Sequence, residues 1–408
     1  MCGCPSTRRS DPGELAWRWP AADECGFCRV GFNEIRTSRQ GRSGGGDVNA
    51  IQLHCVTVSG TPAIMGEMLG ESLRDSIAGL VDHRLNNAAS YLAERSIHGG
   101  MEAYRDAARA CLAVLQEWDH DGFIELQATA RGAKVTLEDL YATSNLTDIR
   151  DVASIGALPP GADEGCTAFM SPAAGTSPLV AGQTWDLNAG DVHYVVGVHR
   201  LPDDGPETWS VTVAGTPTLI GMNEHGLWVG TTNLKVRGAR PGVGYLDIQH
   251  RAIRERTASE AARIAIEAPR AAAHSYWYAD PAQGVQLECS SDRAVRRDLG
   301  QLPLVQTNHC LDEAHVACES EPVSPSSRSR LERVGALLEG GLHDADAARE
   351  VMMDRSGGSL AINRYPEDGE PTTTNACLVG IPADRRLEAC RGPADRGKWL
   401  TLEFERGN

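Results

Sequence analysis

Two short stretches decide the fold of this chain: Asp163-Glu164-Gly165-Cys166-Thr167-Ala168-Phe169 and Ala181-Gly182-Gln183-Thr184-Trp185-Asp186. The first places a cysteine directly after a glycine and before a strand-like segment, and the second is an apolar run that ends in a turn and an acid. A nucleophilic thiol needs a base beside it, and a cysteine that begins a chain has its own α-amino group, which titrates near neutral pH. The cysteine of a Gly-Cys dipeptide, taken alone, is usually a buried thiol of the core. The interpretation of Cys166 as a nucleophile therefore depends on the second stretch.

Together the two stretches resemble the N-terminal-nucleophile (Ntn) hydrolases, in the branch of the acyl-coenzyme A:6-aminopenicillanic-acid acyltransferases (isopenicillin-N acyltransferase, peptidase C45). The resemblance implies that the chain is a precursor which cleaves itself between Gly165 and Cys166. The thiol would attack the preceding carbonyl, shift the acyl group from nitrogen to sulfur, and let water release the upstream part. Gly165 suits this step because it puts no side chain in the path and tolerates backbone strain. Freed Cys166 would then act as nucleophile and base.

The resemblance implies roles for further residues. Asp186 matches the acid that holds or orients the freed α-ammonium, and Asn233 matches an amide that donates to the oxyanion of the tetrahedral intermediate. Removing such a donor costs ~10²–10³ in rate. Asn308 resembles a second asparagine near the site, with a strand-end turn cap as the alternative. Arg330 resembles an active-site arginine of the bile-salt and penicillin V amidases, and Arg328, Arg333 or a solvated helix face stay open as alternatives; His225 and His309 are interpreted as turn residues.

Hydrophobic spacing by itself predicts only an α+β fold. The resemblance sharpens this to the Ntn four-layer αββα sandwich, with a mainly helical segment before the nucleophile. It extends over about residues 60–405, and its main departure is Thr184, where the family commonly has asparagine in Gly-Gln-Asn-Trp-Asp. The predicted domains are a polar, flexible extension over 1–48, the N-terminal (α-subunit) part of the Ntn domain over 49–165, and its C-terminal (β-subunit) catalytic part over 166–408.

The pattern also predicts individual elements. Before Cys166 it favours a strand over residues 51–58 and helices over 66–95, 102–118 and from Leu137 onward. After Cys166 it favours short strands at residues 195–199, 209–213, 217–222, 227–232, 275–279 and 285–289. Thr257-Ala-Ser-Glu260 is a capping box that opens a helix to about residue 267, and another helix is predicted over 327–338.

Composition excludes several classes of partner. The net charge of −16 is spread over the chain without a basic block, which argues against nucleic acid as a partner. No stretch approaches the ~18–20 apolar residues of a membrane helix, so no membrane partner is expected. The first thirty residues lack the apolar core of a secretory signal. The default expectation is therefore a cytoplasmic protein.

Metal binding is an open alternative only near the start of the chain. Cys2, Cys4, Cys25 and Cys28 could supply four thiolates to a tetrahedral zinc, although the Cys-x-Cys half is atypical and a disordered segment fits as well. The other eight of the 12 cysteines are scattered, and no other metal or cofactor is expected.

The leading hypothesis is a self-processed cysteine amidohydrolase or N-acyltransferase of secondary metabolism that acts on a small acylated substrate, with a coenzyme A thioester open as acyl donor. Its two fragments, of 165 and 243 residues, would stay associated, and a homo-oligomer is open. The alternatives are a non-catalytic Ntn-like binding scaffold and a metal-dependent hydrolase. Substrate identity, and hydrolysis against acyl transfer, cannot be read from the residues.

Overall fold

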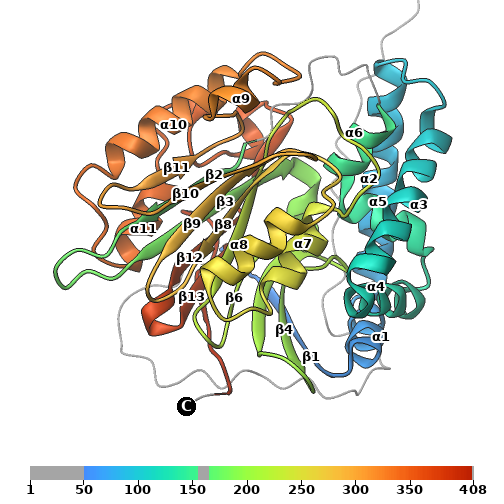
Figure 1. Ribbon diagram of the computed structural model, residues 1–408, viewed down its shortest axis with the longest axis horizontal. Helices are drawn as coiled ribbons and strands as arrows, with labels where there is room; N and C mark the ends of the chain where they lie inside the picture. Colours follow the sequence, from blue (N-terminus) through green and yellow to red (C-terminus); the bar gives the residue numbers. More distant parts are fainter. Residues whose placement is uncertain (1–49, 155–164, 407–408) are drawn as a thin grey trace, which may run out of the picture. The chain divides into compact units, whose positions relative to one another are not determined.

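The computed structural model describes residues 50–154 and 165–406, and these residues form an α+β fold built on two β-sheets (Figure 1). The predicted extension over 1–48, with its four cysteines, lies outside the described residues. Among the described residues, no helix is both long and apolar enough to cross a membrane.

The first sheet joins the two parts of the chain that flank Cys166. Its strands, in spatial order, are β1 (His54–Gly60), β4 (Val195–Pro202), β5 (Thr208–Val213), β6 (Ile220–Asn223), β7 (Trp228–Asn233), β8 (His274–Ala279), β9 (Gly284–Cys289) and β10 (Ala294–Asp298). The pair β1 and β4 is parallel, and each of the other neighbouring pairs is antiparallel. Because β1 precedes Cys166 and β4 follows it, both parts build one sheet.

The second sheet carries the nucleophile strand. Its strands, in spatial order, are β11 (Leu304–Gln306), β2 (Thr167–Ser171), β3 (Val180–Asn188), β12 (Thr372–Ile381), β13 (Arg386–Arg391) and β14 (Leu400–Leu402). All of its pairs are antiparallel. The two sheets pack face to face, with β2 and β3 against β7 and β12 against β6. The side chains between them form the main core, which includes Trp185, Trp228 and Trp277.

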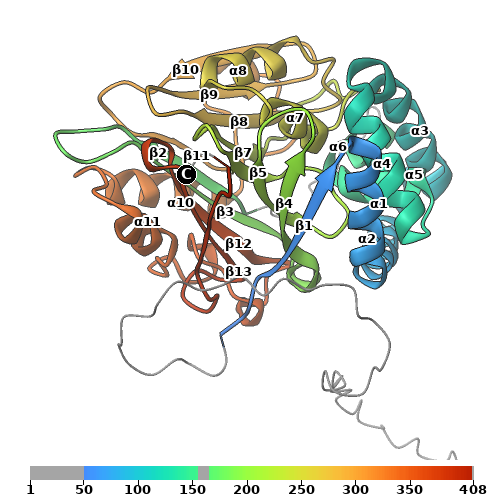
Figure 2. The same cartoon turned by 90° about the horizontal axis from the view of Figure 1, so that it is seen from below.

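Helices cover the outer faces of both sheets. The helices α7 (Tyr245–Ala252) and α8 (Ala258–Glu267) lie on the first sheet, and α10 (Pro325–Leu337) and α11 (Ala345–Met352) lie on the second. A helical group precedes the nucleophile and gathers beside the first sheet (Figure 2): α1 (Pro62–Ser72), α2 (Arg74–Glu94), α3 (Gly100–Trp118), α4 (His120–Ala133), α5 (Leu137–Ser144) and α6 (Leu146–Ala153). Shorter pieces are α9 (Glu313–Val316) and the 3₁₀ turns Ala189–Tyr194, Gly358–Leu360, Pro366–Asp368 and Pro382–Asp384. The predicted αββα sandwich with a helical N-terminal segment is confirmed.

Most predicted elements are present, and the differences have local causes. The capping box at Thr257 and Glu260 is formed and begins α8 as expected. The single helix predicted over 66–95 is wrong, because the backbone leaves helical geometry at Leu73 (φ −113°, ψ 18°) and separates α1 from α2. The sequence interpretation missed α4, which is rich in alanine and glycine, and the short helices α6, α7, α9 and α11.

Candidate active site

Cys166 lies directly before β2, where the pairing of β2 with β3 brings it to Asp186. Thr167 is opposite Thr184 in this antiparallel pair, so Cys166 falls next to Trp185 and Asp186 at the strand ends. The Cys166 side chain is 5% exposed, and its thiol lies 3.7 Å from the main-chain carbonyl oxygen of Asp186. The amide of Gly165 faces the same oxygen at 3.5 Å. The main chain of Asp186 therefore holds the Gly165–Cys166 peptide on both sides.

The site leaves no space for a side chain at position 165. A Cβ atom built on Gly165 would lie 2.5 Å from Nη1 of Arg364 and 2.8 Å from both Cβ and Oδ2 of Asp186. Real Cβ atoms essentially never show contacts below 3.0 Å. Glycine before the nucleophile is thus required by packing.

Asp186 is a buried carboxylate between two guanidinium groups. It is fully buried, and the hydroxyls of Thr184 and Thr374 lie close enough to its carboxylate to act on its pKa. Burial raises the pKa of Asp186 to about 6, although the charges of Arg330 and Arg364 act to lower it. Such a group gains from a new positive charge beside it, which is what a freed α-ammonium at Cys166 would supply.

Arg364 was missed by the sequence interpretation. It is fully buried, and none of its three guanidinium nitrogens has a hydrogen-bond partner in the described part of the chain. Its main chain is fixed on β12, since its amide donates to the hydroxyl of Thr374 at 2.9 Å and its carbonyl accepts from the hydroxyl of Thr373 at 3.0 Å. Nothing around Asn363-Arg364 marks it in the sequence, because a loop outside any motif delivers it to Gly165.

Arg330, Asn308 and Asn233 form a hydrogen-bonded chain that ends on the nucleophile. Arg330 is fully buried, donates to the main-chain carbonyl of Cys166, and donates to the Thr167 hydroxyl at 3.0 Å. It also donates to Oδ1 of Asn308 at 3.0 Å, and the Asn308 amide donates to the main-chain carbonyl of Asn233 at 3.1 Å. Asn233 ends β7 and is 8% exposed. All five predicted site residues therefore come together.

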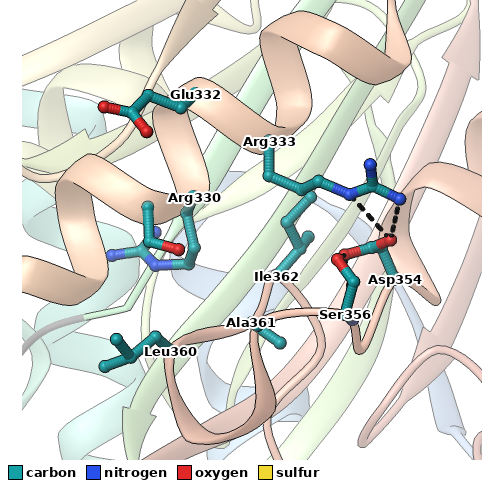
Figure 3. A pocket seen from close by; sticks show the side chains of 10 residues that line it. Arg330, Glu332, Arg333, Asp354, Ser356, Leu360, Ala361 and Ile362 are labelled. Carbon is teal, nitrogen blue, oxygen red and sulfur yellow. Dashed lines mark hydrogen bonds and ion pairs between the residues drawn. The ribbon is translucent and has the colours of Figure 1, made fainter.

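The alternatives to Arg330 lie elsewhere. Arg328 is exposed on α10, and Arg333 forms an ion pair with Asp354 in which its side chain is 42% exposed. Figure 3 shows this ion pair at a separate hollow of about 340 Å³ between α10 and residues 354–362. Arg330 lies in the wall of this hollow, and Cys166 does not. The hollow is therefore distinct from the pocket at the thiol.

A small cavity lies at the thiol side of the site. It is lined by Thr147, Cys166, Trp185, Asp186, Leu187, Leu219, Thr231, Asn233, Tyr245 and His274, and its volume is about 20 Å³. That is room for about one water molecule. Two lining residues have a buried polar atom without a hydrogen-bond partner among the described residues, namely the Thr147 hydroxyl and Nδ1 of His274. Such atoms are costly, and their concentration indicates a site where chemistry or a ligand needs them.

His225 and His309, which the sequence analysis interprets as turn residues, do not line this cavity. His309 sits at 2.8 Å from the Ser327 hydroxyl, and its pKa is lowered by burial and then by Arg330 and Arg328. His225 follows Asn223 in a tight turn and lies 3.2 Å from Arg256. Within residues 50–154 and 165–406, no group of three or more histidine, cysteine or acidic side chains is placed to hold a metal ion.

Several solved structures are similar to this chain at low sequence identity. They include a Caenorhabditis elegans N-acylethanolamine-hydrolyzing acid amidase ortholog (14% identity, 58% of this chain and 100% of that chain, TM-score 0.42). They also include penicillin V acylase from Agrobacterium tumefaciens (14% identity, 59% of this chain and 87% of that chain, TM-score 0.38). A mutant conjugated bile acid hydrolase from Clostridium perfringens gives 11% identity over 59% of this chain and 97% of that chain, with a TM-score of 0.39.

Sequence comparison gives the family. A curated relative, the 40 kDa form of acyl-coenzyme A:6-aminopenicillanic-acid-acyltransferase from Emericella nidulans, is 24% identical over 326 residues, which cover 77% of this chain and 85% of that protein. The family model for acyl-coenzyme A:6-aminopenicillanic acid acyl-transferase matches residues 182–395, which include Asp186, Asn233, Asn308, Arg330 and Arg364. Since the matched segment is just over half of the chain, this protein belongs to the acyl-coenzyme A:6-aminopenicillanic acid acyl-transferase family.

Proposed function

We propose that this protein is a self-processing cysteine amidase or acyltransferase whose nucleophile is Cys166. The observation that carries the proposal is the convergence of one thiol, one fully buried carboxylate and one strand-end asparagine at a single buried cavity. Cys166, Asp186 and Asn233 come from three different strands or strand ends, and a scaffold that only binds has no need of all three.

In the first step the protein cleaves its own chain. The Cys166 thiol attacks the carbonyl carbon of Gly165, the bond from that carbon to the Cys166 nitrogen breaks, and a thioester replaces the peptide. Water then attacks the thioester, which leaves a carboxylate on Gly165 and a free α-amino group on Cys166. Nη1 of Arg364 borders the space beside the α-carbon of Gly165, and the Arg364 nitrogens have no hydrogen-bond partner among the described residues. Our proposal therefore gives Arg364 the role of stabilising the charge that develops on the Gly165 carbonyl.

In the second step the freed cysteine transfers an acyl group. Its α-amino group serves as the base, and buried Asp186 holds the ammonium that forms. The thiolate attacks the carbonyl of an amide or thioester, and the side-chain amide of Asn233 donates to the oxyanion. Asn308 and Arg330 fix the main chain on both sides of this reaction, through the carbonyls of Asn233 and Cys166. The acyl-enzyme then passes its acyl group to water or to an amine.

The substrate class follows from the family and from the site. The Emericella nidulans relative is named as an acyltransferase, and its name gives acyl-coenzyme A and 6-aminopenicillanic acid. We accordingly propose a small acylated amine as substrate and a coenzyme A thioester as an alternative acyl donor. Hydrolysis or transfer is decided by how well the acyl-enzyme excludes water.

The test is the intact mass of the purified chain beside Cys166→Ala, both under denaturing conditions. We expect two pieces from the wild type, one of which begins at Cys166, and one uncut chain from the variant. Cys310→Ala is a matched control, because Cys310 is equally buried but lies in a separate apolar cluster, and this variant should be cut like the wild type. A wild-type chain that stays whole would favour the binding scaffold instead.

A further inference from the structure

Self-cleavage needs a base that the mature enzyme does not need. Before the Gly165–Cys166 bond breaks, the nitrogen of Cys166 is an amide and cannot accept a proton from the thiol. The thiolate must therefore be formed by another group that reaches the cavity directly or through one water. This requirement rests on the proposed function, because it exists only if Cys166 cleaves the chain.

His274 is the imidazole at this cavity. It begins β8 opposite Asn233 of β7, so the two side chains lie on the same face of the sheet at a Cβ separation of roughly 5 Å. His274 and Cys166 both line the cavity, which holds about one water molecule in its 20 Å³. A water molecule in this cavity would give the thiol and His274 a route for proton transfer.

The hydrogen bonds of His274 fix its tautomer. Its Nε2 lies 2.6 Å from Oδ1 of Asp148, and a carboxylate only accepts, so Nε2 carries a hydrogen. Nδ1 then presents a lone pair, and this atom is buried with no partner among the described residues. Asp148 is itself fixed, because its second oxygen accepts from the main-chain amide of Tyr245 at 3.0 Å. The Tyr245 ring stacks on His274 at 4.2 Å.

A second histidine in the same fold shows what a merely structural pair looks like. His199 lies 2.6 Å from Glu207 through Nε2 and stacks on Trp209 at 4.3 Å, so its burial and contacts match those of His274. Its Nδ1, however, faces the hydroxyl of Thr57 at 3.4 Å, and His199 does not line the cavity of Cys166. The free Nδ1 is the feature that separates His274 from a core histidine.

We infer that His274 is the base for self-cleavage and that Asp148 is its positioning residue. Nδ1 takes the proton of the Cys166 thiol, and the thiolate attacks Gly165. The imidazolium is stabilised by Asp148 and returns the proton to the departing nitrogen of Cys166 as the thioester forms. In the hydrolysis that follows, Nδ1 accepts a proton from water and passes it to the leaving thiolate.

The experiment follows the cleavage of newly made chain in a cell-free translation, after a short pulse of labelled amino acid. We expect His274→Gln to slow the appearance of the fragment that begins at Cys166 about a hundredfold, within the range of general base catalysis. Asp148→Asn should slow it at least about tenfold, because an amide cannot stabilise the imidazolium. The control His199→Gln should be cut at the wild-type rate.

Chemical rescue separates a base from a structural residue. His274→Gly leaves a hole of the shape of imidazole, and added imidazole should restore its cleavage in a saturating manner. Cleavage of His274→Gln at the wild-type rate would overturn the assignment, and so would a slow His274→Gly chain that imidazole does not restore. Failure of the proposed function looks different, because then the wild-type chain itself stays uncut and the inference falls with it.

Discussion

At the scale of single residues, Gly165 passes between the carboxyl group of Asp186 and the guanidinium group of Arg364. The contact with Arg364 involves the flexible end of a side chain, which can move, but the contact with Cβ of Asp186 cannot be relieved without shifting β3. The space that excludes a side chain at position 165 is bounded by Asp186 and by Arg364, whose guanidinium nitrogens have no hydrogen-bond partner in the described residues. Packing and catalysis therefore depend on the same contact.

Gly165→Ala tests this contact. Overpacking of this kind typically costs about 1–3 kcal/mol. Because the strain falls on the peptide that reacts, we expect cleavage to slow by roughly ten- to a hundredfold. The measurement is the fraction of cut chain over time by denaturing mass. Gly335→Ala is the matched control, since an added Cβ in α10 meets nothing within 4 Å. Wild-type cleavage by Gly165→Ala would contradict the steric account.

How much of the site the sequence predicts depends on whether a residue carries a motif. Cys166, Asp186 and Asn233 stand in recognisable local patterns, and the structure brings them together with Asn308 and Arg330. Arg364 and His274 stand in no such pattern. They reach the site because a loop beside the second sheet and the first residue of β8 converge there. The closeness of two segments so far apart in the chain cannot be read from one sequence.

At the scale of elements, two glycines of α1 determine how closely this helix packs on α4. Cβ atoms at Gly66 and Gly70 would lie 2.1 and 2.3 Å from the carbonyl oxygens of Glu125 and Thr129, so these glycines let the two helices approach closely. The helix α4 was not predicted, because only Phe123 and Leu126 among its buried residues are large and apolar, which gives little amphipathic signal. This close packing depends on contacts between two separate helices, so the sequence of either helix alone does not predict it.

Glu125 ties α4 to two other elements. Its carboxylate accepts from Arg200 of β4 at 2.8 Å and lies 3.3 Å from His250 of α7, and all three side chains are buried. Burial alone would raise the pKa of Glu125, but the charges of Arg200 and His250 outweigh it and hold that pKa well below the ordinary value. A depressed pKa stabilises the fold above the unfolded-state pKa, and the contribution is lost as the pH falls through the folded-state pKa.

Glu125→Gln in the uncut Cys166→Ala background should therefore lower the free energy of unfolding by about 3–5 kcal/mol at pH 7.5, since it leaves a buried arginine without its charge partner. The difference between the two chains should shrink as the pH falls below about 4.5, where the unfolded carboxylate takes up a proton. Urea unfolding at a series of pH values measures it. The control Glu102→Gln, which removes an exposed ion pair with Arg109, should not measurably change the free energy of unfolding. If Glu125→Gln lowers that free energy by the same amount at every pH, the electrostatic explanation is wrong.

At the scale of the whole molecule, the predicted cut does not divide the chain into two independent folds. The strand β1 pairs with β4 over seven residues in parallel, and the main core mixes side chains such as Leu80 and Leu112 from before Cys166 with Trp209 and Ile248 from after it. Parallel pairing between distant segments carries no local turn signal, so the sequence predicts the strand but not its neighbour. The sandwich is therefore one body built from both sides of the scissile bond.

This interleaving predicts that the two fragments stay associated after cleavage. Separation would strip β1 from its neighbour and expose the shared apolar core to water. In native size-exclusion chromatography the processed wild type should elute as one species at the same volume as uncut Cys166→Ala, and both fragments should appear in that peak. They should part only when urea unfolds the protein, at the concentration where the core is lost. An N-terminal fragment that elutes alone without denaturant would mean that its contacts with β4 and the core contribute too little to outweigh the entropy of association.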